Sequence, residues 1–148
     1  RMNLENWSSN GWLKPHQTSR QEIQKLLNLI RRDLKDSQST DISADWRFAI
    51  AYNAALTCCQ IALYCRGYEV ARGQSEHYRI IQSLTMTIGE ELAPVKTYLN
   101  ACRNKRNIAD YESAGSVSAA EVAELITVAS DLFTKISNWL TANYPEMA

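Results

Sequence analysis

Residues 43 to 66 form a segment in which nearly every position is apolar or small. Arranged as a helix, it carries apolar side chains on every side rather than along one stripe, from Trp46 through Ile61. Such a helix cannot leave a whole face in water and has to be covered by other elements. The segment therefore predicts a central helix that stops at Gly67, a residue typical of the position after a helix C-terminus.

Helices of an ordinary amphipathic pattern flank this segment. One is predicted to begin at Ser19, whose hydroxyl can cap the first amides while Glu22 completes a capping box. It ends in the polar run from 35 to 41, which is rich in residues that bond their own backbone in turns. Ser118 and Glu121 make a second capping box, and the apolar residues after it predict a last helix of about six turns.

The region between the central and the last helix is helical from near Ser75 but is interrupted. Gly89 and Pro94 predict a kink or a short break with a new helix starting there, because proline is tolerated in a first turn. No strand pattern with hairpin turns is visible. The expected fold class is all-α, an up-and-down bundle of four to five helices that forms a single domain over residues 18–148.

Residues 1–17 show no sustained helical period and are expected to form an N-terminal arm. The arm carries Trp7 and Trp12, two large apolar rings that need to be buried. We expect them to dock on the bundle, and the alternative is that they close an interface with a partner.

The charges of the chain balance, with 16 basic and 16 acidic residues and a formal net charge of zero. No global positive field then draws it onto nucleic acid or anionic lipid, so any such contact has to come from a local patch. No apolar stretch is expected to approach the roughly 20 residues that span a bilayer, and no membrane partner is expected. The N-terminus lacks the charged and apolar segments of a signal peptide, which favours a cytoplasmic protein.

The four cysteines are Cys58, Cys59, Cys65 and Cys102, and the first three lie inside the central apolar segment. A thiol in such a segment packs like a small hydrophobic side chain. None of the four has the Cys-x-x-Cys or Cys/His spacing of a zinc site, and the sequence contains no phosphate-binding glycine loop. We therefore expect a reduced protein with no metal and no cofactor.

The segment 103–112 concentrates polar and charged side chains on a predicted helix. Residues three or four positions apart share a helix face, which groups Arg103, Arg106, Asn107, Asp110 and Tyr111. Because a guanidinium binds phosphate through paired hydrogen bonds, this face could hold an anion or an RNA backbone. The alternative is a salt-bridged surface in which Arg106 pairs with Asp110 and Lys105 is solvated.

The order of these features resembles the HEPN (higher eukaryotes and prokaryotes nucleotide-binding) domain family over about residues 43–140. The matching features are Tyr52-Asn53-Ala54-Ala55 in the central segment, Gly67-Tyr68 at its end, Glu76-His77-Tyr78 at the start of the next helix, and residues 103–111. The last of these is the most specific, because related HEPN proteins carry an arginine-rich stretch that ends in Asn-x-Ala-Asp-Tyr.

The resemblance implies a homodimer that pairs through the helix of this motif and places two polar segments in one cleft. Catalytic HEPN members are metal-independent ribonucleases in which an Arg-Asn pair is followed by histidine. Matching Arg106 and Asn107 to that pair leaves Asp110 or Tyr111 where the histidine belongs. Neither replaces an imidazole at neutral pH, since the ordinary pKa values of the two side chains are about 3.9 and about 10.

His77 is the only plausible substitute for that histidine, because His16 lies in the arm. If one straight helix joined His77 to Arg106, the two would lie about 40 Å apart at 1.5 Å per residue. Only the predicted kink or a partner subunit could bring them closer.

The expected function is that of a non-catalytic HEPN-like domain that binds RNA, a nucleotide or a protein partner through the face of Arg106. By analogy with the family, its context is a toxin-antitoxin, defence or stress system, with a nucleotidyltransferase as a potential partner. The first alternative is a metal-independent endoribonuclease that uses Arg106 with His77 or Tyr111. The second is a structural interaction bundle in which the four tryptophans carry an aromatic interface.

Overall fold

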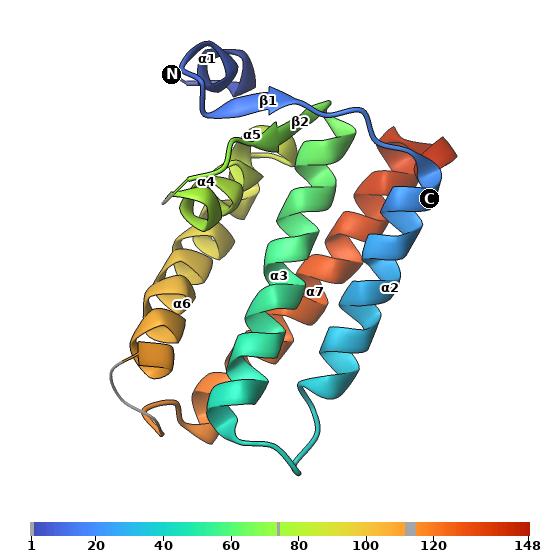
Figure 1. Cartoon of the computed structure of the whole chain (residues 1–148). Helices are drawn as coiled ribbons and strands as arrows, with labels where there is room; N and C mark the ends of the chain where they lie inside the picture. The colour runs from blue at the N-terminus through green and yellow to red at the C-terminus, as the bar shows by residue number, and fades with distance from the viewer. Residues whose placement is uncertain (1, 74, 112–114) are drawn as a thin grey trace.

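The computed structural model of the protein describes residues 2–73, 75–111 and 115–148, with the side chains of 108–111 outside the description. In chain order the elements are α1 (Leu4–Ser9), β1 (Leu13–Pro15), α2 (Arg20–Asp36), α3 (Ala44–Cys65), β2 (Tyr68–Val70), α4 (Glu76–Gln82), α5 (Leu84–Thr87), the 3-10 turn η1 (Glu90–Leu92), α6 (Ala93–Tyr111), α7 (Ala119–Asn143) and the 3-10 turn η2 (Pro145–Met147). The long helices α2, α3, α6 and α7 alternate in direction, which confirms the predicted up-and-down, all-α bundle (Figure 1).

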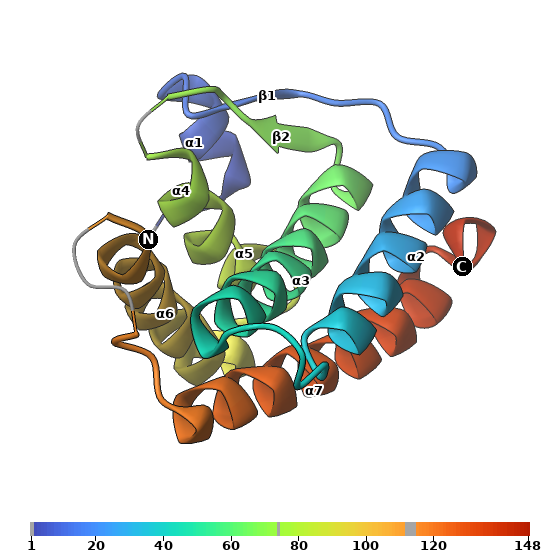
Figure 2. The ribbon, with the colours of Figure 1, turned by 60° about the horizontal axis from the view of Figure 1, so that its bottom comes forward.

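Helix α3 lies at the centre of this bundle, as its all-round apolar pattern predicts. It packs against α2 and α7 on one side and against α4 and α6 on the other (Figure 2). Ala51, Ile61 and Leu63 point in different directions around the helix, and each is at most 1% exposed. Trp46 departs from the pattern, because it lies in the first turn of α3 and is 67% exposed.

By length and composition alone, α3 could cross a membrane. The expectation that no apolar stretch approaches that length was therefore wrong. Most of the helix is buried inside the fold, with 72% of the residues in its most apolar window covered. The apolar character of α3 is thus accounted for by its central place in the bundle, since the core helix of a domain is apolar for the same reason as a membrane span.

The predicted helix ends are largely confirmed. Ser19, Ser43 and Ser118 cap α2, α3 and α7, each hydroxyl accepting a hydrogen bond from a first-turn amide. Glu121 completes the capping box of α7, and Gly67 follows α3 with a φ of 91°, a left-handed conformation that glycine adopts without strain. The predicted break near Gly89 is also present, because α5 and η1 separate α4 from α6.

The N-terminal arm has more structure than its sequence predicts. Asn3 and Asn6 form a capping box that starts the short helix α1, although no helix is expected there. Strand β1 then pairs with β2 in antiparallel register, Leu13 opposite Val70, where no strand is expected either. Each strand has three residues, too short to show the alternation by which a strand is recognised. The arm nevertheless docks on the bundle as expected, with Trp7 buried in the core.

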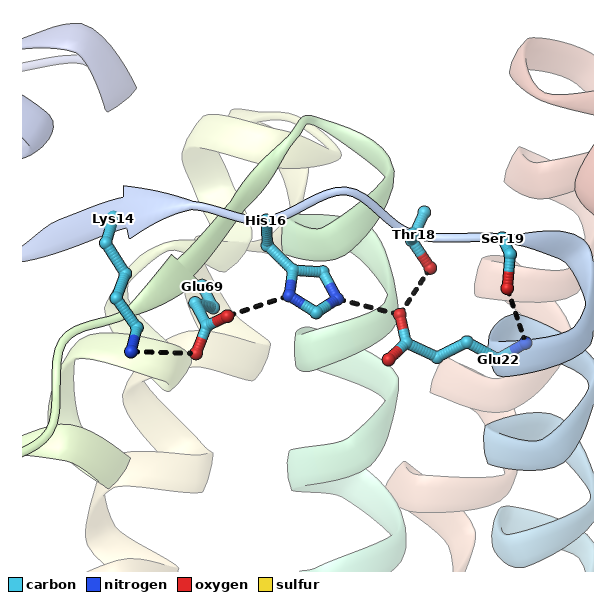
Figure 3. Close-up of polar contacts among 6 residues, drawn as sticks. All are labelled: Lys14, His16, Thr18, Ser19, Glu22 and Glu69. Atoms are coloured by element: carbon cyan, nitrogen blue, oxygen red, sulfur yellow. Dashed lines mark hydrogen bonds and ion pairs between the residues drawn. The ribbon is translucent and has the colours of Figure 1, made fainter.

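His16, just after β1, fastens the arm to two parts of the bundle (Figure 3). Its Nδ1 lies 2.7 Å from a carboxylate oxygen of Glu69 in β2, and its Nε2 lies 2.7 Å from Glu22 in α2. The ring also stacks on Tyr64 of α3, with centroids 4.0 Å apart. The Glu22 carboxylate accepts hydrogen bonds from His16 and Thr18. It therefore does not bond back to the Ser19 amide, so only the serine half of the predicted capping box is formed.

The two carboxylates set the charge of this histidine. Burial alone lowers the pKa of His16, but the hydrogen bonds and charges of Glu22 and Glu69 outweigh burial and raise it above its ordinary value. The pKa of Glu22 is lowered, because its hydrogen bonds to Thr18 and His16 outweigh the effect of burial. The ion pair between protonated His16 and ionised Glu22 therefore exists at pH values above the lowered pKa of Glu22 and below the raised pKa of His16.

We expect His16→Gln to lower the stability of the protein by about 1–3 kcal/mol near pH 6, because it removes a charge held by two carboxylates. Since the pKa of His16 is raised on folding, its contribution is fully present below about pH 6.5 and is lost as the pH rises through the folded value. The difference in unfolding free energy between the two proteins, measured in urea, should therefore shrink as the pH rises from 6.5 through the raised pKa of His16. A difference that is constant over this range would show that the charge of His16 contributes nothing.

Candidate functional site

The candidate site is built around Tyr52, the largest of the fully buried side chains. Tyr52 projects from α3 and is only 1% exposed, so its phenolic oxygen needs a hydrogen-bond partner inside the protein. That partner is His77 at the start of α4, whose Nδ1 lies 3.3 Å from the Tyr52 oxygen. The two rings are tilted against each other at a centroid distance of 5.9 Å.

Two arginines of α6 complete the cluster. The guanidinium carbon of Arg106 lies 5.5 Å from the centroid of the Tyr52 ring, and that of Arg103 lies 5.5 Å from the centroid of the Tyr78 ring. Cations above an aromatic ring are attracted to its electron-rich face, which restrains both side chains. His77, Arg103 and Arg106 thus gather around two tyrosines.

The chain reversal between α4 and α6 brings these residues together. The break at α5 and η1 turns the chain so that α4 packs against α6 instead of continuing into it. The separation of about 40 Å, which assumes one straight helix, therefore does not apply to His77 and Arg106. Within one subunit, both groups contact the same buried tyrosine.

The pKa values in the cluster follow from burial and from the nearby arginines. Burial lowers the pKa of His77, Arg106 and Arg103 lower it further, and Glu76 opposes them only in part. Burial also raises the pKa of Tyr52, which the two arginines offset only partly. At neutral pH the site therefore contains a neutral imidazole, a protonated phenol and two guanidinium cations.

The other predicted site residues stand apart from this cluster or outside the described part of the chain. Asn107 is exposed on α6. The backbone of Asp110 and Tyr111 continues α6, but their side chains, and with them the predicted pair of Arg106 with Asp110, lie outside the described residues. Lys105 is not simply solvated as the salt-bridge alternative assumes, because its amino group lies 3.4 Å from a carboxylate oxygen of Glu121 in α7.

Sequence reasoning missed the two tyrosines that organise the site. Tyr52 and Tyr78 are among the residues that carry the family resemblance, but neither is predicted as a site residue. A signal was present for Tyr52, because a phenol on a helix that is apolar all round has to find a buried polar partner. No comparable signal marks Tyr78, whose role depends on the packing of α4 against α6.

The tryptophans do not form one aromatic surface within the chain. Trp7 and Trp12 pack edge to face at 5.6 Å in the arm, where Trp7 is buried. Trp46 lies in the first turn of α3, and that end of α3 is opposite the arm (Figure 1). Trp139 is partly buried near the end of α7. An interface made by all four rings together is therefore not present in a single chain.

Metal ligation and cysteine chemistry gain no support from the described residues. Within residues 2–73, 75–111 and 115–148, no group of three or more His, Cys, Asp or Glu side chains is placed to hold a metal ion. Burial raises the pKa of Cys59 to about 12 and that of Cys102 to about 11, so both stay protonated at neutral pH. A thiol in that state is a poor nucleophile.

Comparisons with known proteins do not place the chain in a family. A scan against protein-family models, a search of curated proteins and a search of solved structures each gave no significant match. The function of the chain therefore has to be inferred from the geometry of its site.

The charge of Arg106 should be visible in the titration of His77. We expect Arg106→Gln to raise the pKa of His77 toward its ordinary value, although burial will still hold it below that value. The imidazole C–H resonances in NMR report this titration, and His16 in the same spectra is an internal reference. Lys105→Gln is the matched control, since Lys105 belongs to the same helix but pairs with Glu121. An unchanged pKa of His77 in Arg106→Gln would contradict the described geometry.

Proposed function

We propose that this protein is a HEPN-like, non-catalytic RNA-binding domain that holds the RNA backbone at Arg103 and Arg106. The observation that carries the proposal is the meeting of His77 with the two arginines around Tyr52 and Tyr78. A positive patch of this kind is what a chain of zero net charge needs in order to bind a polyanion.

The arginines are suited to phosphate by position and by chemistry. Arg103 and Arg106 lie one helical turn apart on α6, and each is restrained by an aromatic ring. A guanidinium has five N–H donors, so the single bond from Nε of Arg103 to Asn100, 3.1 Å long, leaves donors for phosphate oxygens. Because stacking already orders these side chains, binding a phosphate costs less side-chain entropy than it would at free surface arginines.

Nearby polar groups fit the same role. Asn107 is exposed one helical turn after Arg103 on α6, so its amide can bond to a sugar or phosphate oxygen of a strand that extends beyond the cluster. Neutral His77 adds a polar group without a third positive charge, which would repel the two arginines. Two restrained guanidinium groups with a neutral imidazole and an amide nearby match the phosphates and sugars of an RNA backbone, so we favour RNA over a protein partner.

The remaining parts of the proposal are supported by the family resemblance alone. They are a homodimer that pairs through α6, a cytoplasmic place in a toxin-antitoxin, defence or stress system, and a nucleotidyltransferase as partner. In a dimer of this type two copies of Arg106 would face one cleft and double its positive charge.

Single-stranded RNA binding tests the proposal. We expect Arg106→Gln to weaken binding about 10-fold and to reduce the slope of log affinity against log salt by about one, because one phosphate contact is lost. Fluorescence anisotropy over a salt series measures both quantities. Lys105→Gln removes a cation from the same helix and should leave affinity nearly unchanged, because Glu121 already neutralises Lys105. Equal losses in the two variants would indicate nonspecific attraction and defeat the proposal.

A metal-independent ribonuclease is the second candidate, and the contact of His77 with Tyr52 beside Arg106 favours it. A neutral imidazole can accept the proton of a 2′-hydroxyl while an arginine steadies the phosphate that the oxygen attacks. For this role the ring proton of His77 has to lie on Nδ1 and be donated to the Tyr52 oxygen, which leaves the lone pair of Nε2 to accept the proton.

Cleavage in the presence of a chelator distinguishes the two candidates. The ribonuclease requires that labelled RNA be cut to fragments with 2′,3′-cyclic phosphate ends, and that His77→Gln abolish cutting while RNA still binds. For the binding domain we expect salt-sensitive retention of RNA in a gel without any cutting. Cleavage by His77→Gln at the rate of the unaltered protein would exclude His77 as the base.

A further inference from the structure

A groove of about 400 Å³ lies between the N-terminal arm and the helices α4 to α6. We call it the arm groove. Its lining combines large rings and two methionines with two cations, and includes Met2, Trp7, Trp12, Tyr78, Arg79 and Lys96. Two of these side chains are exposed to an unusual degree for their type, Met2 at 45% and Tyr78 at 41%. The sheet of β1 and β2 holds the arm in the position that forms one wall.

A guanidinium and two tryptophan rings make up this wall. The guanidinium of Arg79 in α4 lies over the ring of Trp12, 4.4 Å from its centroid. Trp12 in turn meets Trp7 edge to face, and Trp7 is anchored in the core. A guanidinium plane backed by a tryptophan is a rigid, flat and positively charged surface, of the kind on which unpaired bases stack.

The arm groove is continuous with the proposed phosphate site through Tyr78. This side chain lines the groove, and its ring also lies under the guanidinium of Arg103. A phosphate on Arg103 therefore lies next to the ring that the groove presents. In a nucleic acid strand each base is joined through one sugar to its phosphate, so adjacent sites for a phosphate and a base suit a single nucleotide.

The charge of the lining also suits a strand of nucleic acid. Among the described residues of the groove, Arg79 and Lys96 are cationic and Glu90 is acidic. Arg103 adds a further positive charge at the end where Tyr78 lies. A groove with aromatic rings and an excess of positive charge matches the pattern by which proteins hold single strands.

We propose that the arm groove stacks a base of single-stranded RNA, with Tyr78 and the Arg79–Trp12 pair as its stacking surfaces and the adjoining phosphate on Arg103. This inference rests on the proposed RNA-binding function and narrows it to unpaired RNA. A duplex cannot use the groove, because its bases are already stacked on one another and paired.

Two variants of one residue test the stacking surface. Tyr78→Ala removes the ring, and we expect it to weaken binding of a single-stranded RNA oligonucleotide about 10-fold, the usual effect of losing one base stack. Tyr78→Phe keeps the ring and loses only the hydroxyl, so its affinity should stay near that of the unaltered protein. Because Tyr78 is 41% exposed, we expect both variants to fold. Far-UV circular dichroism checks this.

An abasic oligonucleotide of the same length separates this inference from the proposed function. It retains the phosphates, so Tyr78→Ala should weaken its binding much less than that of normal RNA, by no more than the loss of the ring that orders Arg103, while Arg106→Gln should weaken both. Quenching of tryptophan fluorescence on binding provides a second readout. We expect normal RNA to quench through Trp12 and abasic RNA not to, and Trp12→Phe to remove most of the quenching.

The possible outcomes assign failure to one claim or the other. If Arg106→Gln weakens RNA binding and Tyr78→Ala does not, the stacking inference is wrong and the phosphate site stands. If neither variant changes RNA binding, the proposed function itself is wrong. If Tyr78→Ala turns a dimer of the protein into a monomer, the arm groove holds a second copy of the chain, which also overturns the inference. Equal affinity for duplex and single-stranded RNA would do the same.

Discussion

The need to bury α3 on all sides is the constraint on which the other elements depend. No single amphipathic helix can cover a helix with apolar side chains all around it, so α2 and α7 cover one side and α4 and α6 the other. The small residues Ala51, Ala54 and Ala55 are completely buried, which lets these neighbours approach closely. The break between α4 and α6 also helps to bury α3, because it lets one stretch of chain cover α3 with two helices that pack against each other.

Tyr52 shows how a polar group in that central helix can create a site. A phenol inside the core has to be hydrogen bonded, and here the partner is His77 from the helix that the chain reversal brings alongside. The face of the same ring attracts the charge of Arg106. A neutral imidazole from α4 and a guanidinium from α6 are thus held against one buried side chain, and groups with pKa values perturbed in this way are typical of sites with a function.

Much of the fold could be predicted from the sequence, whereas the site could be predicted only in part. The serine caps, Gly67 and the all-round apolar pattern of α3 are local signals, and local signals predict helices well. The pairing of β1 with β2 could not be predicted, since it depends on tertiary docking of two three-residue strands. Arg103 and Arg106 were visible as a motif, but the approach of His77 to them depends on the direction of the chain after Gly89, and a glycine signals only that a break occurs.

The attachment of the arm has a consequence for the order in which the protein folds. His16 and Glu69 are 53 residues apart in the sequence, with the whole of α2 and α3 between them. Closing so long a loop is entropically unfavourable unless the intervening helices have already brought its ends together. The arm can therefore dock only after the α2–α3 hairpin has formed, and amide exchange should find β1 opening at a lower free energy than α3. The wall that the arm contributes to its groove is then assembled later than the α2–α3 hairpin.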